Sequence, residues 1–146
     1  MQLEPGGEFA HVAIRIGTRW LHAAPYAGVE FVSELAKIGS DFTILTNGRA
    51  QEIKLEEAGK YLGLRYDSSF DWSDTRSSYC SKLIANLLGI EPTPAHFAAS
   101  HWRGVGLLRT EGAVGISPDE IFQILRKDGF QPRGVNTCEG IFHKAY

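Results

Sequence analysis

The sequence predicts an α+β fold, in which an antiparallel sheet packs against a helix that carries a cysteine. Two features predict this class. Residues 9–32 alternate apolar and polar side chains between glycine-containing turns, which is the pattern of successive antiparallel strands. Residues 78–88 and 117–128 instead repeat apolar side chains every three or four positions, as helices with one buried face do. Because 146 residues is the size of one compact domain, we expect residues 1–146 to form a single domain.

The first strand is expected at residues 9–16, where Val12 and Ile14 fall on one face and His11 falls on the other. Gly17 and Thr18 then form a two-residue turn that leads into the next strand. In order, the expected elements of this part are strands at 9–16, 19–24, 28–32 and 41–45, with a helical turn at 34–38 before the last of them. The first three strands therefore form an antiparallel meander.

A surface helix is expected at residues 51–62, because Leu55, Ala58 and Leu62 fall on one stripe among charged neighbours. The segment 65–78 that follows is polar, aromatic and rich in turn residues. We expect this segment to be an ordered loop that leads into the cysteine helix.

The cysteine helix is expected at residues 78–88, with Ser78 as its N-cap and Gly89 ending it. A last helix begins at the capping box of residues 117–120, which has proline at its first helical position, and it ends near Gly129. Two expectations complete the chain: mainly loop at 91–115 with a strand near 106–110, and a loosely ordered terminus at 138–143.

Composition and charge exclude several classes of function. The net charge is −2 and the pI about 6.2, so the chain lacks the basic excess that phosphate binding in nucleic acids requires. No apolar run approaches the roughly 20 residues that span a bilayer, and the first eight residues do not resemble a signal peptide. We therefore expect no nucleic-acid partner, no membrane span and a cytoplasmic location, with export by a dedicated secretion system as the alternative.

Cys80 is the candidate nucleophile. A chain of this size does not need a disulfide to stabilise its core, so Cys80 and Cys138 are expected to be free thiols. Cys80 falls in the first turn of the helix at 78–88, where unpaired backbone N–H groups and the helix dipole stabilise a thiolate. It also starts the apolar stripe of that helix, which faces the sheet.

The register of the first two strands brings two histidines together. A turn at Gly17 and Thr18 pairs residues whose numbers sum to about 35, so His11 and His22 share a face as diagonal neighbours. One imidazole can then accept the thiol proton while the other orients it. The small Ala13 between them leaves room for the cysteine helix on that face.

Ordinary structural roles compete with this interpretation. Cysteine is among the residues most often buried, so Cys80 on a helix stripe is consistent with a plain core position. His11 and His22 taken singly are also consistent with half-buried structural histidines. Only the joint geometry of the three residues favours nucleophilic catalysis.

Four segments resemble the YaeF/YiiX-like permuted papain-like amidases, which are relatives of the NlpC-type cell-wall peptidases. The matching segments are Phe9-Ala10-His11-Val12-Ala13-Ile14, Leu21-His22-Ala23 with Gly28-Val29, Tyr61-Leu62-Gly63 with Tyr66-Asp67, and Tyr79-Cys80-Ser81-Lys82-Leu83-Ile84. In this chain the histidine strand precedes the cysteine helix, as in the permuted family, whereas papain has the opposite order. The resemblance spans roughly residues 9–88.

The resemblance implies a permuted papain-like fold and a role for each matching residue. It implies Cys80 as nucleophile, His11 as general base and His22 as the orienting residue, with no metal and no cofactor. It implies an oxyanion site made by the Cys80 N–H and a tyrosine, either Tyr66 or Tyr79, which stay open alternatives. The remaining site candidates are Ser81, Asp67 and Trp72, the last two of which also suit a loop-stabilising role. Lys82 replaces a usual acidic residue, which we expect to change the charge of the site's rim.

The expected function is that of a cysteine peptidase or amidase. It would cleave an amide of a small peptide or acyl-amide substrate, such as a bacterial peptidoglycan stem peptide or an N-acyl amino acid, through an acyl-enzyme on Cys80. One alternative is thioester or lipid-ester chemistry of the lecithin-retinol acyltransferase type. Another is a binding module without turnover. Metal binding by His96, His101, Cys138 or His143 is disfavoured, because their spacing fits no common ligand motif.

Overall fold

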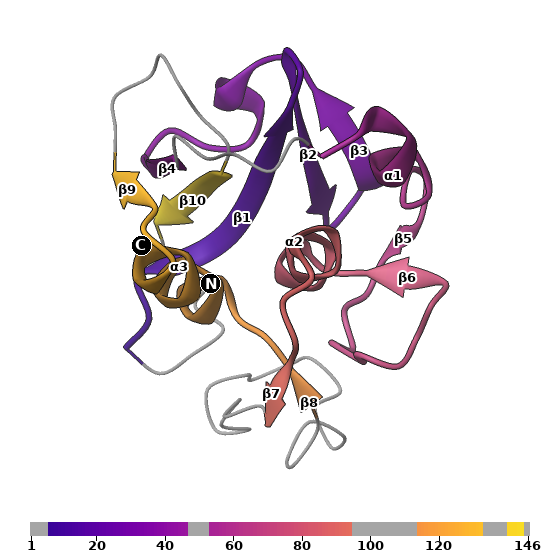
Figure 1. The fold of residues 1–146 in the computed structure, drawn as a ribbon. Coiled ribbons are helices and arrows are strands. Elements are labelled where there is room, and N and C mark those ends of the chain that lie inside the picture. Colours follow the sequence, from indigo (N-terminus) through magenta and orange to yellow (C-terminus); the bar gives the residue numbers. More distant parts are fainter. Residues whose placement is uncertain (1–5, 47–52, 95–113, 133–139, 145–146) are drawn as a thin grey trace.

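The computed structural model, described over residues 6–46, 53–94, 114–132 and 140–144, has a mixed α+β architecture (Figure 1). The elements in order are β1 (Phe9–Ile16), β2 (Arg19–Ala24), β3 (Gly28–Val32), the 3-10 turn η1 (Leu35–Lys37), β4 (Phe42–Thr46), α1 (Leu55–Gly59), β5 (Arg65–Tyr66), β6 (Ser77–Ser78), α2 (Cys80–Leu88), β7 (Thr93–Pro94), β8 (Val114–Gly115), α3 (Pro118–Lys127), β9 (Gln131–Pro132) and β10 (Gly140–Lys144). The α+β class expected from the sequence is confirmed.

The main sheet has the strand order β3-β2-β1-β10-β4-β9, and each neighbouring pair is antiparallel. The meander of the first three strands is therefore confirmed. The expectation of a loose terminus at residues 138–143 is wrong for residues 140–143, because β10 lies between β1 and β4 in the middle of the sheet, while residues 138–139 lie outside the described residues. A central strand satisfies the backbone N–H and C=O groups of both neighbours, which ties the end of the chain to its beginning.

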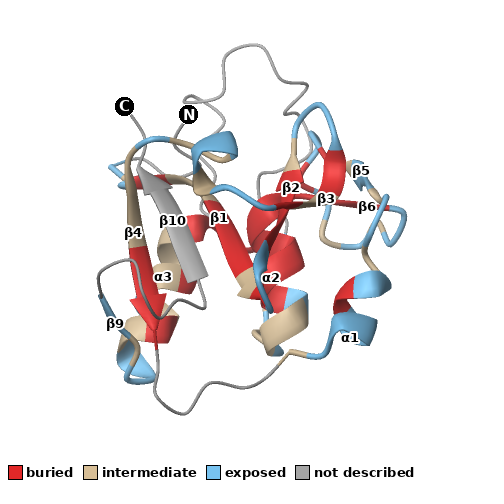
Figure 2. Cartoon of the chain, turned by 90° about the horizontal axis from the view of Figure 1, so that it is seen from above, coloured by how far each residue is buried: buried red, intermediate tan, exposed pale blue. Residues whose placement is uncertain are grey.

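Helices α2 and α3 lie on the same side of the sheet, α2 against β1 and β2 and α3 against β1 (Figures 1 and 2). Figure 2 shows buried residues on the central strands and on the sides of the two helices that face them. The main apolar core lies between these layers and includes Val12, Ile14, Leu21, Leu83 and Ile121. A smaller apolar cluster, made by Trp20, Val32 and Ile44 with side chains around η1, covers part of the other face.

The last helix forms as the sequence predicts. Ser117 Oγ accepts the backbone N–H of Glu120 at 3.0 Å, and the Ser117 N–H donates to Glu120 Oε2 at 2.8 Å, which completes the capping box. Ile121 and Leu125 are buried on its inner side. The capping residues therefore set the start of α3, and its apolar stripe sets which side meets the sheet.

The helix expected at residues 51–62 is much shorter than predicted. It is the single α1 turn, and of its expected stripe only Ala58 is buried, while Leu55 and Leu62 are 57% and 44% exposed. The predicted loop at 65–78 is confirmed apart from β5 and β6, two short strands that pair in parallel. The strand expected near 106–110 lies outside the described residues.

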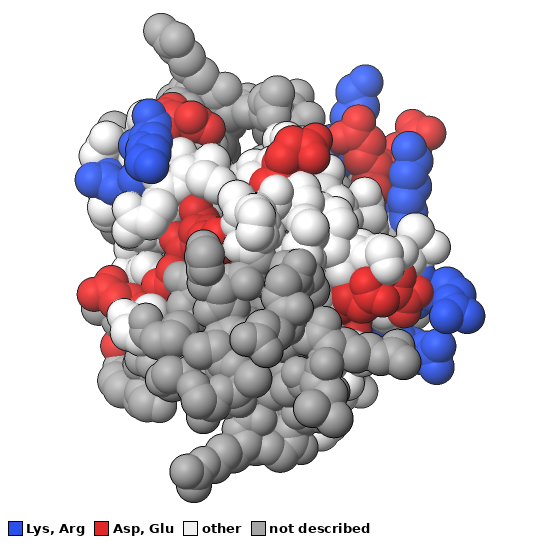
Figure 3. Space-filling model, turned by 90° about the horizontal axis from the view of Figure 1, so that it is seen from below, with Lys and Arg blue, Asp and Glu red and all other residues white. Residues whose placement is uncertain are grey.

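The described surface carries mixed charge. On the face drawn in Figure 3, basic side chains lie at the two margins with acidic ones beside them, and further acidic side chains lie among the uncharged residues between the margins. Opposite charges at such close range largely cancel each other's long-range field. Separately, no described helix is both long and apolar enough to cross a lipid bilayer.

Candidate active site

His11 and His22 are joined directly, as the sequence predicts. His11 Nε2 lies 3.0 Å from His22 Nδ1, which is a hydrogen-bond distance between two ring nitrogens. The pairing of Ile14 with Leu21 confirms the expected register between β1 and β2. His11 is half-buried and His22 is buried, with 4% of its surface exposed.

The histidine bridge lies where β1 and β2 separate. The β1–β2 ladder joins residues 14–16 to 19–21, whereas β1 pairs with β10 as far as Phe9 and β2 pairs with β3 as far as Ala24. Figure 1 shows the two strands diverging toward α2. We call this gap, between residues 11–13 and 22–24, the β1–β2 opening. Across this opening the side chains of His11 and His22 join the two strands through their ring nitrogens, beyond the last β1–β2 ladder pair.

Cys80 is the first residue of α2, whose N-cap is Tyr79. The expected N-cap at Ser78, with Cys80 as the second helical residue, is wrong because Ser78 belongs to β6 and pairs with Tyr66. Cys80 nevertheless lies in the first turn of the helix, as expected. The Cys80 side chain is 1% exposed and belongs to the main core.

Helix α2 packs on the other side of β1 from the one we expected. Cys80 and Leu83 share a core with Val12 and Ile14, whose side chains alternate along β1 with that of His11. The expected seat of the helix over Ala13 is therefore wrong. A backbone hydrogen bond from Val12 reaches the Cys80 thiol, which places the sulfur at the β1 backbone one residue from His11. The thiol thus borders the β1–β2 opening from the α2 side.

The surroundings of the Cys80 thiol make it harder to ionise than an ordinary cysteine. Burial raises the pKa of Cys80, and backbone hydrogen bonds from Val12 and Ser81 oppose the rise without overcoming it. This is the reverse of the lowered pKa expected from the first turn of a helix. The free-energy cost of removing a thiolate from water is larger than the stabilisation that the helix N-terminus gives it.

The two candidate oxyanion tyrosines differ in their surroundings. Tyr79 is fully buried, its ring lies edge-on to Phe70, and its hydroxyl accepts the Ile116 N–H at 3.4 Å. Tyr66 is only half-buried. Burial is the main cause that raises the pKa of both phenols, and the nearby Cys80 raises each further. Tyr66 is therefore the tyrosine that lies near Cys80 and keeps exposed surface.

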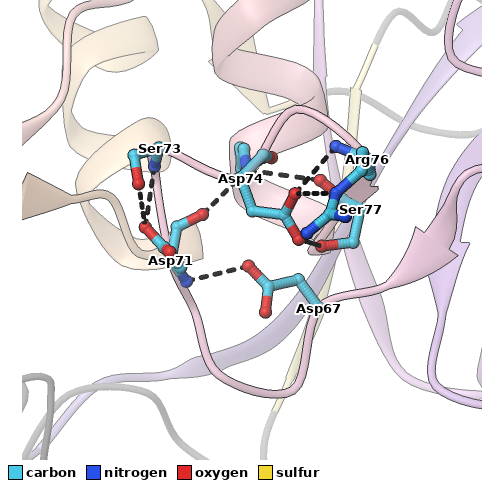
Figure 4. A network of polar contacts seen from close by, with 7 residues as sticks. Asp67, Asp71, Ser73, Asp74, Arg76 and Ser77 are labelled. Carbon is cyan, nitrogen blue, oxygen red and sulfur yellow. Dashed lines mark hydrogen bonds and ion pairs between the residues drawn. The ribbon is translucent and has the colours of Figure 1, made fainter.

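Ser81, Asp67 and Trp72 have structural partners. Ser81 Oγ donates to the Ile116 carbonyl at 2.8 Å and so joins α2 to the segment before α3. The buried Asp67 carboxylate accepts the N–H groups of Ser69 at 2.9 Å and Asp71 at 2.8 Å, and Figure 4 shows Asp67 reaching Asp71 across the loop. Trp72 is half-buried and packs against the main core.

Lys82 is buried and does not lie on a rim. Its ammonium donates to the backbone carbonyls of Asp71 at 2.8 Å, Asp74 at 2.5 Å and Ser77 at 3.2 Å. The expected change in rim charge is therefore wrong. Side-chain hydrogen bonds within the same loop join Ser73 to Asp71 and Ser77 to Asp74 (Figure 4).

Glu30 is a neighbour of the histidine pair that the sequence interpretation missed. It lies on β3 opposite His22 in register, and its Oε1 is 3.5 Å from His22 Nε2. The turn at residues 25–28 makes paired residues of β2 and β3 sum to 52, which could have identified Glu30. Burial lowers the pKa of His22 below its ordinary value of 6.5, and Glu30 acts in the opposite direction.

The described residues contain no cluster of three metal-binding side chains. Of the disfavoured ligands, His96, His101 and Cys138 lie outside the described residues, and His143 stands opposite His11 in the β1–β10 register. Cavities of about 470 Å³ beside the start of α3 and about 560 Å³ beside the end of α2 are not lined by Cys80.

No family model, curated protein or solved structure matches this chain. The resemblance to the permuted amidases therefore stays a prediction from the sequence.

Proposed function

We propose that this chain is a cysteine-dependent hydrolase with a permuted papain-like fold, in which Cys80 is the nucleophile, His11 the base and His22 its orienting partner. The observation that carries the proposal is the 3.0 Å contact of His11 Nε2 with His22 Nδ1 at the β1–β2 opening. That contact occupies one ring nitrogen of His11. We propose that the other ring nitrogen, Nδ1, accepts the proton of the thiol that borders the same opening.

The reaction starts from the neutral thiol. As the sulfur attacks the substrate carbonyl carbon, His11 Nδ1 accepts the thiol proton, the C–S bond forms, and the carbonyl π electrons move to the oxygen. The Cys80 N–H and the Tyr66 hydroxyl are the donors proposed for this oxyanion. Collapse of the intermediate breaks the C–N bond, and His11 returns the proton to the leaving amine. Water then hydrolyses the thioester with His11 again as base.

The proposed substrate is an amide of a small peptide or an N-acyl amino acid, with a bacterial peptidoglycan stem peptide as the first example. This choice rests on the sequence resemblance. Thioester or lipid-ester cleavage is the second candidate, because Cys80 belongs to the same apolar core as Val12, Leu83 and Ile84, and an acyl chain is the substrate part that suits apolar neighbours.

The test compares wild type with Cys80→Ala, using Cys138→Ala as a matched control that removes the only other cysteine. Each protein is incubated with peptidoglycan fragments, N-acyl amino acids and an acyl thioester, and mass spectrometry follows both the products and the intact protein. We expect turnover and a covalent acyl adduct in wild type and Cys138→Ala, and neither in Cys80→Ala. Equal turnover by Cys80→Ala would refute the assigned nucleophile. A biological effect that survives in Cys80→Ala without turnover would identify a binding module.

A further inference from the structure

We propose that Glu30 is a positioning residue of this site, which holds His22 in the tautomer protonated at Nε2 and thereby sets which nitrogen of His11 is the base. The catalytic part of this inference rests on the proposed function. The part that concerns the protons of the imidazoles stands on the geometry alone.

The Glu30 carboxylate lies near the far side of the His22 ring, away from His11. Glu30 and His22 are direct partners in the β2–β3 register, so both side chains lie on the same face of the sheet. The distance from Oε1 to Nε2 is 3.5 Å, within ion-pair range but longer than a well-formed hydrogen bond. His22 Nε2 is buried and has no closer hydrogen-bond partner among the described residues.

The proton positions follow from this arrangement. A carboxylate only accepts hydrogen bonds, so a neutral His22 facing it carries its proton on Nε2. His22 Nδ1 is then an acceptor, and the nitrogen 3.0 Å away, His11 Nε2, must be the donor. A neutral His11 with its proton on Nε2 is unprotonated on Nδ1, so Nδ1 is its basic nitrogen. One carboxylate on β3 therefore fixes the tautomers of two rings on two other strands.

The same carboxylate opposes the cost of charging the pair. When His11 takes a proton during attack, the half-buried ring of His11 and the buried ring of His22 together carry one positive charge. Burial disfavours that charge, and the negative charge of Glu30 favours it, as the opposing effects of burial and Glu30 on the pKa of His22 indicate. Because the Glu30 side chain is 42% exposed, water weakens this effect without removing it.

Nitrogen-15 NMR of the histidine rings tests the tautomer assignment without any substrate. In wild type at pH 7.5 we expect His22 to be protonated at Nε2 and His11 also at Nε2. Glu30→Ala removes the acceptor and is expected to convert His22 to a mixture of both tautomers. Glu30→Gln keeps an acceptor oxygen and is expected to keep the wild-type pattern. An unchanged His22 pattern in Glu30→Ala would overturn the inference, and circular dichroism of each variant verifies that it is folded.

Kinetics on a substrate from the test above then separate the two proposals. We expect kcat of Glu30→Ala and Glu30→Gln to fall roughly tenfold with KM little changed, which corresponds to one pKa unit in a base, and Glu30→Asp to regain part of the loss. Glu56→Gln, at an exposed position of α1, serves as the control with full activity. Full activity in Glu30→Ala alongside an inactive Cys80→Ala would overturn the positioning role of Glu30 and leave the hydrolase proposal intact. If Glu30→Ala changes the His22 tautomer but the wild type shows no Cys80-dependent turnover, the hydrolase proposal is overturned and the tautomer assignment stands.

Discussion

The rings of His11 and His22 lie perpendicular to each other, with planes at 89°, centroids 5.2 Å apart and His11 Nε2 3.0 Å from His22 Nδ1. Nitrogen lone pairs and N–H bonds lie in the plane of an imidazole, so this arrangement directs one ring's edge at the other ring's nitrogen. The position of the His22 ring therefore constrains the orientation of the His11 ring. A stacked pair at similar distance could not do so.

Variants at the two histidines should separate base from orienting partner. We expect His11→Ala to lower kcat/KM by about 100- to 10,000-fold, the usual loss of a general base. His22→Gln retains an acceptor for the His11 N–H and should lose less than His22→Ala. Steady-state kinetics on the same substrate measure this order. Activity of His11→Ala equal to wild type would contradict the assignment of the base.

Stability should fall as the pH drops below about 6.5, the ordinary pKa of histidine. Burial lowers the pKa of His22 in the folded protein, so between the two pKa values the folded state binds fewer protons than the unfolded state. The free energy of unfolding then decreases as the pH falls through this window. Urea unfolding at pH 7.5 and pH 5.5 measures the effect. His22→Gln should reduce the difference, and a stability that rises toward pH 5.5 in wild type would contradict it.

Alkylation should report a sluggish thiol at position 80. Because burial raises the pKa of Cys80, we expect iodoacetamide to modify it more slowly than a model thiol at pH 6 and pH 7.5. The Cys138→Ala variant leaves Cys80 as the only cysteine and removes ambiguity from the mass measurement. Faster alkylation than the model thiol at pH 6 would reveal a resting thiolate, and the reaction would then begin from an ion pair.

Replacement of Lys82 by methionine should destabilise the fold. The change leaves the carbonyls of Asp71, Asp74 and Ser77 without their shared donor in a partly buried loop. We expect a loss of about 2–4 kcal/mol in the free energy of unfolding, because buried acceptors without partners are costly. Lys54→Met, on an exposed residue before α1, should change stability by less than about 0.5 kcal/mol. Equal unfolding midpoints for both variants would show that the ammonium contributes little.

Short-range patterns in the sequence determined much of what was confirmed. The period of two and the Gly17 turn determined the register of β1 and β2, and with it the meeting of His11 and His22. The capping box at Ser117 determined the start of α3. These features depend on residues within a few positions of one another, so local geometry suffices to predict them.

The tertiary structure alone decided which side of β1 receives α2, that Lys82 is enclosed by its own loop, and that residues 140–144 fill the middle of the sheet. In each case the sequence around the element allows more than one arrangement, and contacts with distant residues select one of them. The apolar face of α2 fits either side of a strand with small and apolar residues on both. The pairing of His11 with His143 joins opposite ends of the chain, and it forms because β1 and β4 both have backbone groups that a strand between them satisfies.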